Sequence, residues 1–466
     1  MKTKSLDMTK GPLFKKIIIY TIPIILSNLL QLLFNAADII VVGQYCGSLA
    51  VAAVGSNGSL VSLLVNIMLG LSVGTGIITA QGIGAKDFKT VKKTVHTAIP
   101  TALIVGGVLS VVGFFLSGEI LKLMDSPTDV LPLATTYLKI YFLGVISSSV
   151  YNFGAAILRA AGDTKSPLIF LTISGVVNIL LNLLFVIVFN MGVSGVAIAT
   201  TASQTLSAIL VVITLIKRTD CCHLDIRKMK IYKNELLRII RIGVPSSIQS
   251  SMFSISNVLI QSSVNLFGAV AVSGNAAAAN IEGFVYTSMN AFHMTALNFT
   301  GQNIGAGKFK RVKKVLIENL ICVSVTGIVL GTLSYIFAKP LLSLYITDSS
   351  AAIKIGVTRI ACVGLNYFLC GIMDVIAGVL KGLGSTLYSA LISIIGVCAF
   401  RLFWIFTIFR IEEYHNLKCL FISYPISWII TSAAYILAYF IVLKSIKKRF
   451  KTNKTTVEPE PQNSTT

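Results

Sequence analysis

Long apolar segments, each near the length that crosses a lipid bilayer, recur along almost the whole chain of 466 residues. A helix needs about 20 predominantly apolar residues to span the hydrocarbon core. Charged residues make up only 12% of the chain, whereas soluble domains carry about 25%. The sequence therefore predicts an all-α membrane protein with twelve spanning helices, of which the second, eighth and tenth are long or kinked. The predicted spans are 17–42, 49–83, 94–116, 131–158, 168–190, 193–216, 239–267, 270–299, 315–337, 355–380, 388–409 and 420–443.

Basic residues are concentrated in every second connection between these spans. Cytoplasmic loops of membrane proteins carry an excess of Lys and Arg, so this asymmetry predicts an even number of spans in the cell membrane, with both termini in the cytoplasm. It also accounts for the net charge of +21 without a nucleic-acid partner. Seven segments hold 31 of the 39 lysines and arginines: 1–16, 84–93, 159–167, 217–241, 305–314, 381–387 and 444–466.

The longest basic connection divides the chain into two halves. We expect a cytoplasmic N-terminus (1–16), an N-lobe (17–216), a cytoplasmic linker (217–238), a C-lobe (239–443) and a cytoplasmic tail (444–466). Apolar and charged residues alternate in KNELLRIIRIG, at 233–243. That pattern is typical of an amphipathic helix on a membrane surface, which would join the two lobes.

The two halves repeat one another in sequence. QGIGAKDFKTVKK at 81–93 and QNIGAGKFKRVKK at 302–314 are identical at nine of thirteen positions, with an offset of 221. Pro23 and Pro245 form a second pair, at an offset of 222. An offset of six spans gives both halves the same topology, so the sequence predicts two six-helix bundles related by a pseudo-two-fold axis along the membrane normal.

Four polar side chains form a stripe on the first predicted span. Asn28, Gln31, Asn35 and Asp38 are spaced by three, four and three residues, which places them on one side of a helix with 3.6 residues per turn. Ionisable groups at membrane depth are costly and usually mark function. Asp38, with Asn35 beside it, is therefore predicted to bind a proton or ion whose gradient would drive transport. A structural hydrogen bond is the alternative for Asp38.

Neutral polar residues line the fifth and sixth spans. Asn178 and Asn182 lie four residues apart, after Ser174, and Thr200 begins a polar face of the next span. Such groups can orient a carboxylate or ligate a cation, but they cannot titrate. Interhelical packing is the alternative role for each of them.

The second half carries similar stripes, and we predict that they line a substrate cleft together with Gln31. Arg401 lies in the middle of the eleventh span and needs a partner, which Asp374 or Glu282 could supply; a carboxylate paired in this way would be structural. The predicted cleft residues of the second half are Gln249, Asn257, Gln261, Glu282, Tyr286, Asn290, Asp374 and Arg401.

Signatures of other chemistry are missing from the sequence. It has no GxxxxGK[ST] loop for ATP and no HExxH, GxSxG or kinase motif. Its eight cysteines lack the spacing of a zinc site. We therefore expect neither an enzyme nor a metal site, and no cofactor beyond a proton or sodium gradient.

The chain resembles the multidrug and toxic compound extrusion (MATE) family, in a bacterial branch close to the DNA-damage-inducible F transporters. The resemblance covers roughly residues 13–445. It implies two six-helix bundles that face each other in a V around a central cleft, and antiport of cations against organic cations and other amphipathic drugs. The segments that carry it are 22–44, 81–87, 158–168, 192–200, 242–257, 300–314 and 379–386.

The same resemblance assigns roles to several N-lobe residues. Asp38 matches a first-helix aspartate that takes part in proton or sodium coupling, and Asn178, Asn182 and Thr200 match other positions of the N-lobe site. Asn182 stands where many relatives have Asp. Only one titratable group then remains, which favours a one-proton cycle at Asp38 over a sodium cage.

We therefore expect a monomeric antiporter, surrounded by membrane lipids, that exports small cationic or amphipathic molecules. The alternative within the same superfamily is a flippase for lipid-linked oligosaccharides, whose cavity would need several basic residues. Arg401 is the only mid-membrane cation predicted, against Asp38, Glu282 and Asp374, and this balance favours a cationic cargo. A channel would instead need a continuous polar pore.

Overall fold

The computed structural model describes residues 5–124, 127–347 and 349–455, and its regular structure within these ranges is helical. The helices of the first half are α1 (Leu13–Cys46), α2 (Ser48–Ser56), α3 (Gly58–Ala85), α4 (Phe88–Leu123), α5 (Leu131–Ala160), α6 (Lys165–Leu183), the π-helix η1 (Leu184–Val188) and α7 (Gly192–Lys217).

The connection between the halves contains the 3₁₀ turn η2 (Ile226–Lys228). The elements of the second half are α8 (Lys233–Asn265), α9 (Ala269–Gly305), α10 (Phe309–Ile336), α11 (Ala338–Ser343), α12 (Ser350–Cys362), η3 (Gly364–Asn366), α13 (Tyr367–Gly382), α14 (Thr386–Ser393), the π-helix η4 (Ile394–Ala399), α15 (Phe400–Phe406), η5 (Ile408–Arg410), η6 (Glu412–Tyr414) and α16 (Leu417–Thr455). The segment 233–243, predicted as a surface helix of the linker, is the start of α8, which continues unbroken to Asn265.

Ten helical segments of the described chain are long and apolar enough to cross a membrane. Helices α8 and α9, with 33 and 37 residues, are longer than a bilayer requires. They are rich in Ser, Asn and Gln, which lowers their hydropathy. With these two included, twelve segments of spanning length follow one another in the predicted order, and the two polar ones line the cavity described below.

Breaks in helix geometry fall in four of these spans. The second span is divided at Asn57 into α2 and α3, and the tenth is divided by η3. These two were predicted to be long or kinked, and the eighth, α9, is long but unbroken. The π-helices η1 and η4 interrupt the fifth and eleventh spans. Such π segments often occur at functional sites.

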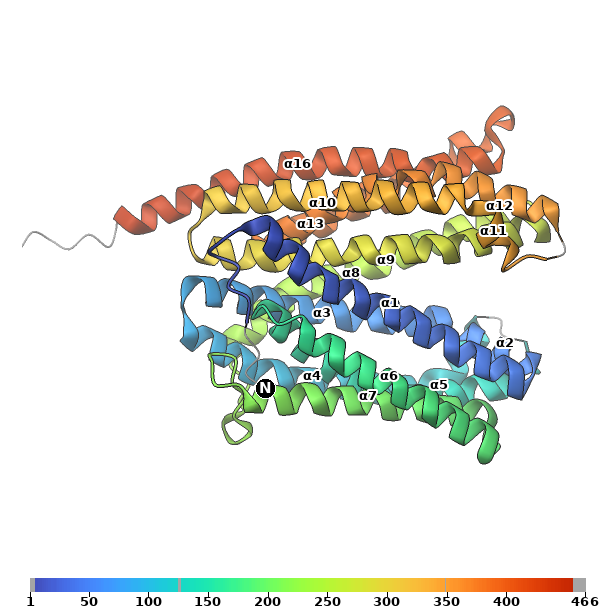
Figure 1. The fold of residues 1–466 in the computed structure, drawn as a ribbon, viewed down its shortest axis with the longest axis horizontal. Helices are drawn as coiled ribbons and strands as arrows, with labels where there is room; N and C mark the ends of the chain where they lie inside the picture. Colours follow the sequence, from blue (N-terminus) through green and yellow to red (C-terminus); the bar gives the residue numbers. More distant parts are fainter. Residues whose placement is uncertain (1–4, 125–126, 348, 456–466) are drawn as a thin grey trace, which may run out of the picture.

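The two halves form two lobes that lie one above the other in Figure 1, with α3 to α7 below and α9, α10, α13 and α16 above. Each lobe has its own apolar core. Val145 and Phe153 belong to the two core clusters of the N-lobe, whereas Met289 and Phe421 belong to the large cluster of the C-lobe. The structure is therefore an all-helical membrane fold with two repeated halves.

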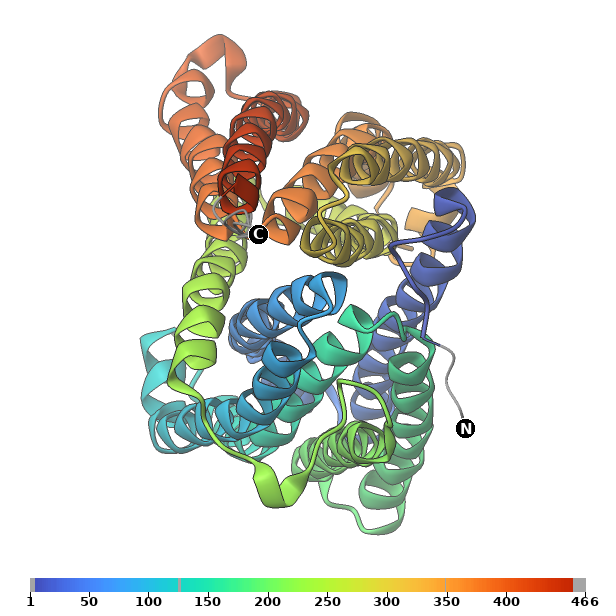
Figure 2. The same cartoon turned by 90° about the vertical axis from the view of Figure 1, so that its left-hand side faces the viewer.

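Helices α1 and α8, the first of each half, both pass from one lobe to the other, as the view along the helices shows (Figure 2). The N-terminal part of α1, including Ile17 and Tyr20, packs in the core of the C-lobe, whereas Val42 near its end packs in the N-lobe. In α8 the order is reversed, with Ile239 in the N-lobe and Val264 in the C-lobe. Both helices contain an internal proline, Pro23 or Pro245.

The lobes meet tightly at the end of the molecule that carries the α3–α4, α9–α10 and α13–α14 connections, called the basic end below. A Cβ atom on Gly84 would overlap the backbone oxygen of Gln302, and one on Gly305 would overlap that of Gln81. Backbone contacts this close need glycine at both repeat-related positions. The two repeated motifs thus pack directly against each other.

Residues 5–12 add a further connection at the basic end. The backbone nitrogen of Leu6 donates to the backbone oxygen of Gly162 in the N-lobe, at 3.3 Å. Met8 is fully buried, and its oxygen accepts a hydrogen bond of 3.1 Å from the side chain of Asn303 in the C-lobe. Arg311 also donates to the backbone oxygens of this segment. The segment is therefore hydrogen-bonded to both lobes and links them at this end.

Candidate functional site

Asp38 lies among neutral hydrogen-bond donors in the N-lobe. Its Oδ1 atom accepts a hydrogen bond of 2.5 Å from Nδ2 of Asn182, and its Oδ2 atom accepts one of 3.4 Å from the Thr200 hydroxyl. Asn178 links the two partners, because it donates to Thr200 at 3.5 Å and accepts from Asn182 at 3.3 Å. Four predicted coupling residues from α1, α6 and α7 therefore form one cluster.

Local structure holds this cluster in place. Asn178 and Asn182 are one turn apart on α6 and are both buried. Nearby, the Ser207 hydroxyl donates to Ser174 at 2.6 Å, which joins α7 to α6. The side-chain oxygen of Asn182 is buried without a hydrogen-bond partner in the described chain. It is therefore available to accept a proton-bearing group or to ligate a cation.

Two other residues of the α1 stripe do not join the cluster. Gln31 and Asn35 are exposed and form no hydrogen bond within the described residues, and Gln31 does not line the cavity described next. Asn28 instead donates to the backbone oxygen of Thr287 on α9, at 3.3 Å. Gln31 therefore lies outside the cavity, and a coupling role for Asn35 stays a prediction. Helix α1 crosses between the lobes, so one face of it does not meet a single neighbour along its length.

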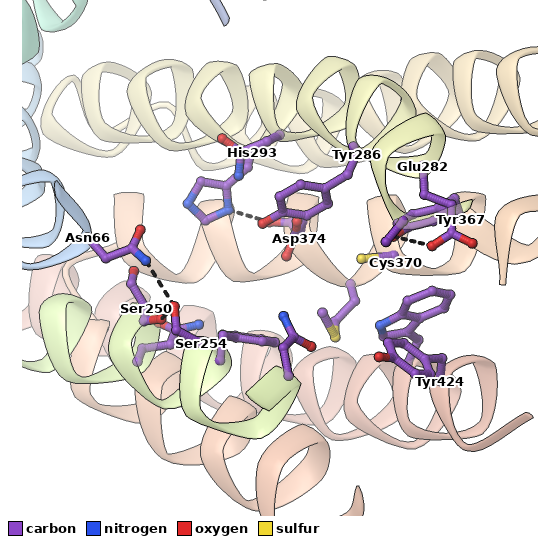
Figure 3. A pocket seen from close by; sticks show the side chains of 18 of the residues that line it. Asn66, Ser250, Ser254, Glu282, Tyr286, His293, Tyr367, Cys370, Asp374 and Tyr424 are labelled. Atoms are coloured by element: carbon purple, nitrogen blue, oxygen red, sulfur yellow. Dashed lines mark hydrogen bonds between the residues drawn. The ribbon is translucent and has the colours of Figure 1, made fainter. Parts of the chain in front are cut away.

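A cavity of about 560 Å³ lies against the C-lobe. It is lined mainly by α8, α9 and α13, with α3 of the N-lobe on one side and single residues or pairs from α12, α15 and α16. Figure 3 shows Asn66, Ser250 and Ser254 at one end, Glu282, Tyr367 and Tyr424 at the other, and His293, Asp374 and Tyr286 between them. Eight of the nine predicted cleft residues line it: Gln249, Asn257, Gln261, Glu282, Tyr286, Asn290, Asp374 and Arg401. Their role in binding stays a prediction.

Glu282 is paired with Arg359, not with Arg401. Its Oε2 atom accepts hydrogen bonds from Nη2 of Arg359 at 2.9 Å and from Nε at 3.2 Å. Asn275 accepts from Nη1 of the same arginine at 2.7 Å. Glu282 and Arg359 are 1% and 6% exposed, so this is a buried ion pair, although the Oε1 atom of Glu282 has no hydrogen-bond partner in the described chain.

Arg401 has an aromatic partner in place of the predicted carboxylate. Its guanidinium carbon lies 4.0 Å from the centre of the Tyr424 ring and 6.0 Å from that of Trp428, and its Nε atom donates to the Ser427 hydroxyl at 3.1 Å. Neither Asp374 nor Glu282 is within ion-pair distance of it in the described chain. A stacked guanidinium retains its full charge.

Asp374, Lys381 and His293 also line the cavity. The backbone oxygen of Asp374 accepts a hydrogen bond of 2.7 Å from Nδ1 of His293. The Oδ2 atom of its carboxyl group is buried without a hydrogen-bond partner in the described residues. Lys381 is 6% exposed. It interacts electrostatically with the carboxylate of Asp374, which is too far away to form an ion pair with it.

The charge balance predicted for the membrane interior is therefore wrong for the cavity. Three basic side chains line it, Arg359, Lys381 and Arg401, against the two acidic residues Glu282 and Asp374. Lys381 was assigned to a loop, but α13 extends to Gly382. Arg359 lies near the end of a predicted span, where the sequence pattern does not reveal its burial.

Comparison with known proteins gives consistent matches over the whole membrane region. The MatE family model matches residues 23–184 and again residues 245–406. The chain is 29% identical over 400 residues to the probable multidrug resistance protein YpnP of Bacillus subtilis, covering 85% of this chain and 89% of that protein. It is 28% identical over 432 residues to YoeA of the same organism, another probable multidrug resistance protein, covering 91% and 92%.

A solved structure gives the same fold. The outward-facing structure of a multidrug resistance MATE family transporter of the MOP superfamily superimposes with a TM-score of 0.89 at 21% identity, covering 96% of this chain and 100% of that one. The two family matches begin at Pro23 and Pro245, the pair of prolines in the predicted repeat, and they confirm that repeat. Together they cover well over half of the sequence, and the chain accordingly belongs to the MatE family of multidrug and toxic compound extrusion transporters.

Proposed function

We propose that this protein is a secondary active efflux antiporter that exchanges protons, or sodium ions, for amphipathic organic molecules. The observation that carries this proposal is the position of Asp38. It is a carboxylate at membrane depth whose hydrogen-bond partners, Asn182 and Thr200, are neutral. With no basic group to neutralise it permanently, a transported cation can do so.

A proton is the simpler coupling ion for this geometry. One carboxylate is fully neutralised by one proton, whereas a metal cation needs several oxygen ligands. The described residues hold no group of three or more His, Cys, Asp or Glu side chains arranged for a metal. Sodium remains the alternative, because Asn178, Asn182 and Thr200 supply neutral oxygen atoms close to the carboxylate. Two gradients imposed separately distinguish the two ions.

The cavity beside the C-lobe is the proposed substrate site. Its volume of about 560 Å³ lies within the roughly 300–1,000 Å³ of pockets that hold drug-sized ligands. Tyr286, Tyr367 and Trp428 provide apolar surface, and Asn257 and Asn290 provide hydrogen-bonding groups. The lobes are in close contact at the basic end, which we propose faces the cytoplasm because of its lysines and arginines. Substrate release on the opposite side follows from this orientation.

One feature of the cavity favours the flippase alternative, and others count against it. Three basic side chains line the cavity, which is what a pyrophosphate group would need. However, Glu282 neutralises Arg359, and a lipid-linked oligosaccharide requires far more space than a drug-sized pocket provides. Drug efflux also agrees with the matched relatives YpnP and YoeA, both described as probable multidrug resistance proteins. The placement in the DNA-damage-inducible F-like branch rests on the sequence resemblance.

The test is transport by purified protein in liposomes, with pH and sodium gradients imposed one at a time. Asp38→Asn should abolish gradient-driven transport of a fluorescent substrate while leaving folding intact. Asp129→Asn, a change at an exposed aspartate of the same chain, is the matched control and should transport normally. Gradient-driven transport by Asp38→Asn at the wild-type rate would rule out this coupling scheme.

A further inference from the structure

Arg401 is a buried cation without a carboxylate partner in the described chain. It is 3% exposed. Only its Nε atom donates a hydrogen bond, to Ser427, so its two terminal nitrogens have no partner among the described residues although the side chain lines the cavity. A buried charge without a counter-charge costs free energy. The position is therefore one at which an incoming anion would be stabilised.

Arg359, which lies near the same aromatic ring, is an arginine with a carboxylate partner in this cavity. Its guanidinium carbon lies 5.4 Å from the centre of the Tyr424 ring, but its nitrogens donate to Glu282 and Asn275. Two guanidinium groups thus lie close to the Tyr424 ring, and the carboxylate of Glu282 pairs with only one of them. The pair with Glu282 leaves the charge of Arg401 uncompensated.

The hydrogen bond to Ser427 fixes the orientation of Arg401. The Ser427 hydroxyl accepts from Nε and donates to the backbone oxygen of Tyr424 at 2.7 Å. Nε is therefore occupied, and the guanidinium plane is held against the Tyr424 ring. The π-helix η4 ends at Ala399, two residues before Arg401. A π segment changes which face of the helix the following residues occupy, so it contributes to turning Arg401 toward α16.

Aromatic side chains continue from Arg401 along the cavity. Tyr424 and Trp428 have ring centres 5.9 Å apart, Trp428 and Tyr367 5.3 Å, and Tyr367 and Tyr286 6.5 Å. Figure 3 shows Tyr424, Tyr367 and Tyr286 around this part of the cavity. A flat aromatic ligand can pack against such a wall while its charged group reaches the guanidinium.

We propose that this cavity binds an aromatic organic anion, whose carboxylate or phosphate group accepts hydrogen bonds from the two terminal nitrogens of Arg401 while its ring packs against Tyr424, Trp428 and Tyr367. The guanidinium fork matches the geometry of both oxyanions. The inference rests on the proposed function in taking this cavity as the substrate site. It differs from the cationic cargo expected from the sequence.

The experiment measures binding to detergent-solubilised protein, without any gradient. Riboflavin and riboflavin 5′-phosphate share one ring system and differ by an anionic group, so the pair isolates the effect of the phosphate. Fluorescein provides a carboxylate in place of the phosphate, and ethidium provides an aromatic cation. The wild-type protein should bind riboflavin 5′-phosphate or fluorescein at least about tenfold more tightly than riboflavin, as one or two charge-assisted hydrogen bonds would produce. Equal affinity for riboflavin and both anions would overturn the proposal, and this comparison needs no variant.

Variants then locate the anion. Arg401→Gln should weaken anion binding about tenfold to a hundredfold and leave riboflavin and ethidium nearly unchanged, and Arg401→Lys should recover only part of the loss. Arg410→Gln is the matched control, since Arg410 is an exposed arginine that lies 5.7 Å from the Phe406 ring. If Arg401→Gln weakened all four ligands equally, the anion site would not be at Arg401 and the inference would fail.

The coupling scheme can fail independently of this inference. Asp38→Asn should still bind riboflavin 5′-phosphate and fluorescein more tightly than riboflavin in detergent, because Asp38 does not line the cavity and makes no contact with an anion there. If the coupling scheme is wrong, the preference for anions in the binding measurements is still expected. If the anion site is wrong, Asp38→Asn is still expected to abolish gradient-driven transport.

Discussion

The side-chain nitrogen of Gln81 donates a hydrogen bond of 2.9 Å to the backbone oxygen of Gly382 in the opposite lobe. Gln302, its repeat-related counterpart, donates one of 2.8 Å to the backbone oxygen of Ala160. Each glutamine therefore satisfies a carbonyl group at the C-terminal end of a helix in the other lobe, where no intrahelical partner is available. The closed basic end is held by two reciprocal bonds.

Gln81→Ala and Gln302→Ala should shift the protein toward conformations that are open at the basic end. Each change leaves a carbonyl group unpaired in the closed state, which costs about 1–3 kcal/mol. Spin labels at the exposed positions Lys89 and Lys310, one in each lobe, should report a longer or broader distance distribution. Gln44→Ala should leave the distribution unchanged, because this exposed glutamine lies near the last residue of α1, at the side of the molecule away from the basic end (Figure 1).

Alanine at Gly84 or Gly305 should prevent the basic end from closing fully. The added Cβ atom would overlap a backbone oxygen of the opposite lobe, and backbone cannot move aside as a flexible side chain can. We expect strongly reduced transport with normal membrane insertion. Gly107→Ala tests whether any alanine would do the same, since nothing lies within 4 Å of a Cβ atom there, and its transport should equal that of the wild type.

Breaking the buried pair of Glu282 and Arg359 should destabilise the C-lobe. Arg359→Gln leaves a carboxylate that is 1% exposed without its counter-charge, a change that costs about 3–5 kcal/mol. The double variant with Glu282→Gln should recover part of this loss, and thermal unfolding in detergent measures both. The exposed pair of Glu119 and Lys122 has the same separation of 2.9 Å, so Glu119→Gln is the control and should change stability by less than about 1 kcal/mol. A similar loss of stability in Arg359→Gln and Glu119→Gln would show that burial does not determine the cost of breaking an ion pair.

Asp220 should give a small stabilisation that depends on pH. Burial alone would raise the pKa of its carboxyl group, but the hydrogen bonds and charge of Arg218 outweigh burial and hold that pKa below its ordinary value. Its stabilising effect is therefore present above about pH 4, the ordinary pKa of an aspartate, and is lost as the pH falls through the lowered pKa. The Asp220 side chain is 40% exposed, so solvent screening limits the effect to about 1 kcal/mol or less.

Asp220→Asn should accordingly lower the unfolding temperature slightly at pH 7, with the difference from wild type shrinking toward pH 3. In an Arg218→Gln background the same change should have almost no effect. An equal difference at all pH values would show that the side chain acts through packing alone.

Helical periodicity placed most of the predicted cleft residues correctly on the cavity wall. Residues such as Glu282, Tyr286 and Asn290 recur every four positions on one helix, so their common face is fixed by helix geometry. The clustering of Asp38 with Asn178, Asn182 and Thr200 was expected from the family resemblance. The number and order of spanning segments followed from hydrophobic length and basic loops.

Partner choice could not be predicted in the same way. Whether Glu282 pairs with Arg359 or Arg401 depends on how α9, α12 and α15 are arranged around α16, and no spacing within one helix contains this information. The burial of Lys381 depends likewise on neighbouring helices. Asn35 has the correct spacing beside Asp38 but is exposed, because periodicity gives a face and not the neighbour that the face meets.

The passage of α1 from one lobe to the other ties Asp38 to the opposite half of the molecule. Tyr20 near one end of this rod lies in the C-lobe core, whereas Asp38, five turns further on, contacts only N-lobe partners in the described chain. Any rotation of one lobe against the other must therefore bend, tilt or twist α1. Pro23 lacks a backbone N–H and weakens the helix between these two anchor points. A change of charge at Asp38 consequently acts on a helix whose other end is fixed in the C-lobe. Helix α1 itself can therefore transmit a structural change between the lobes.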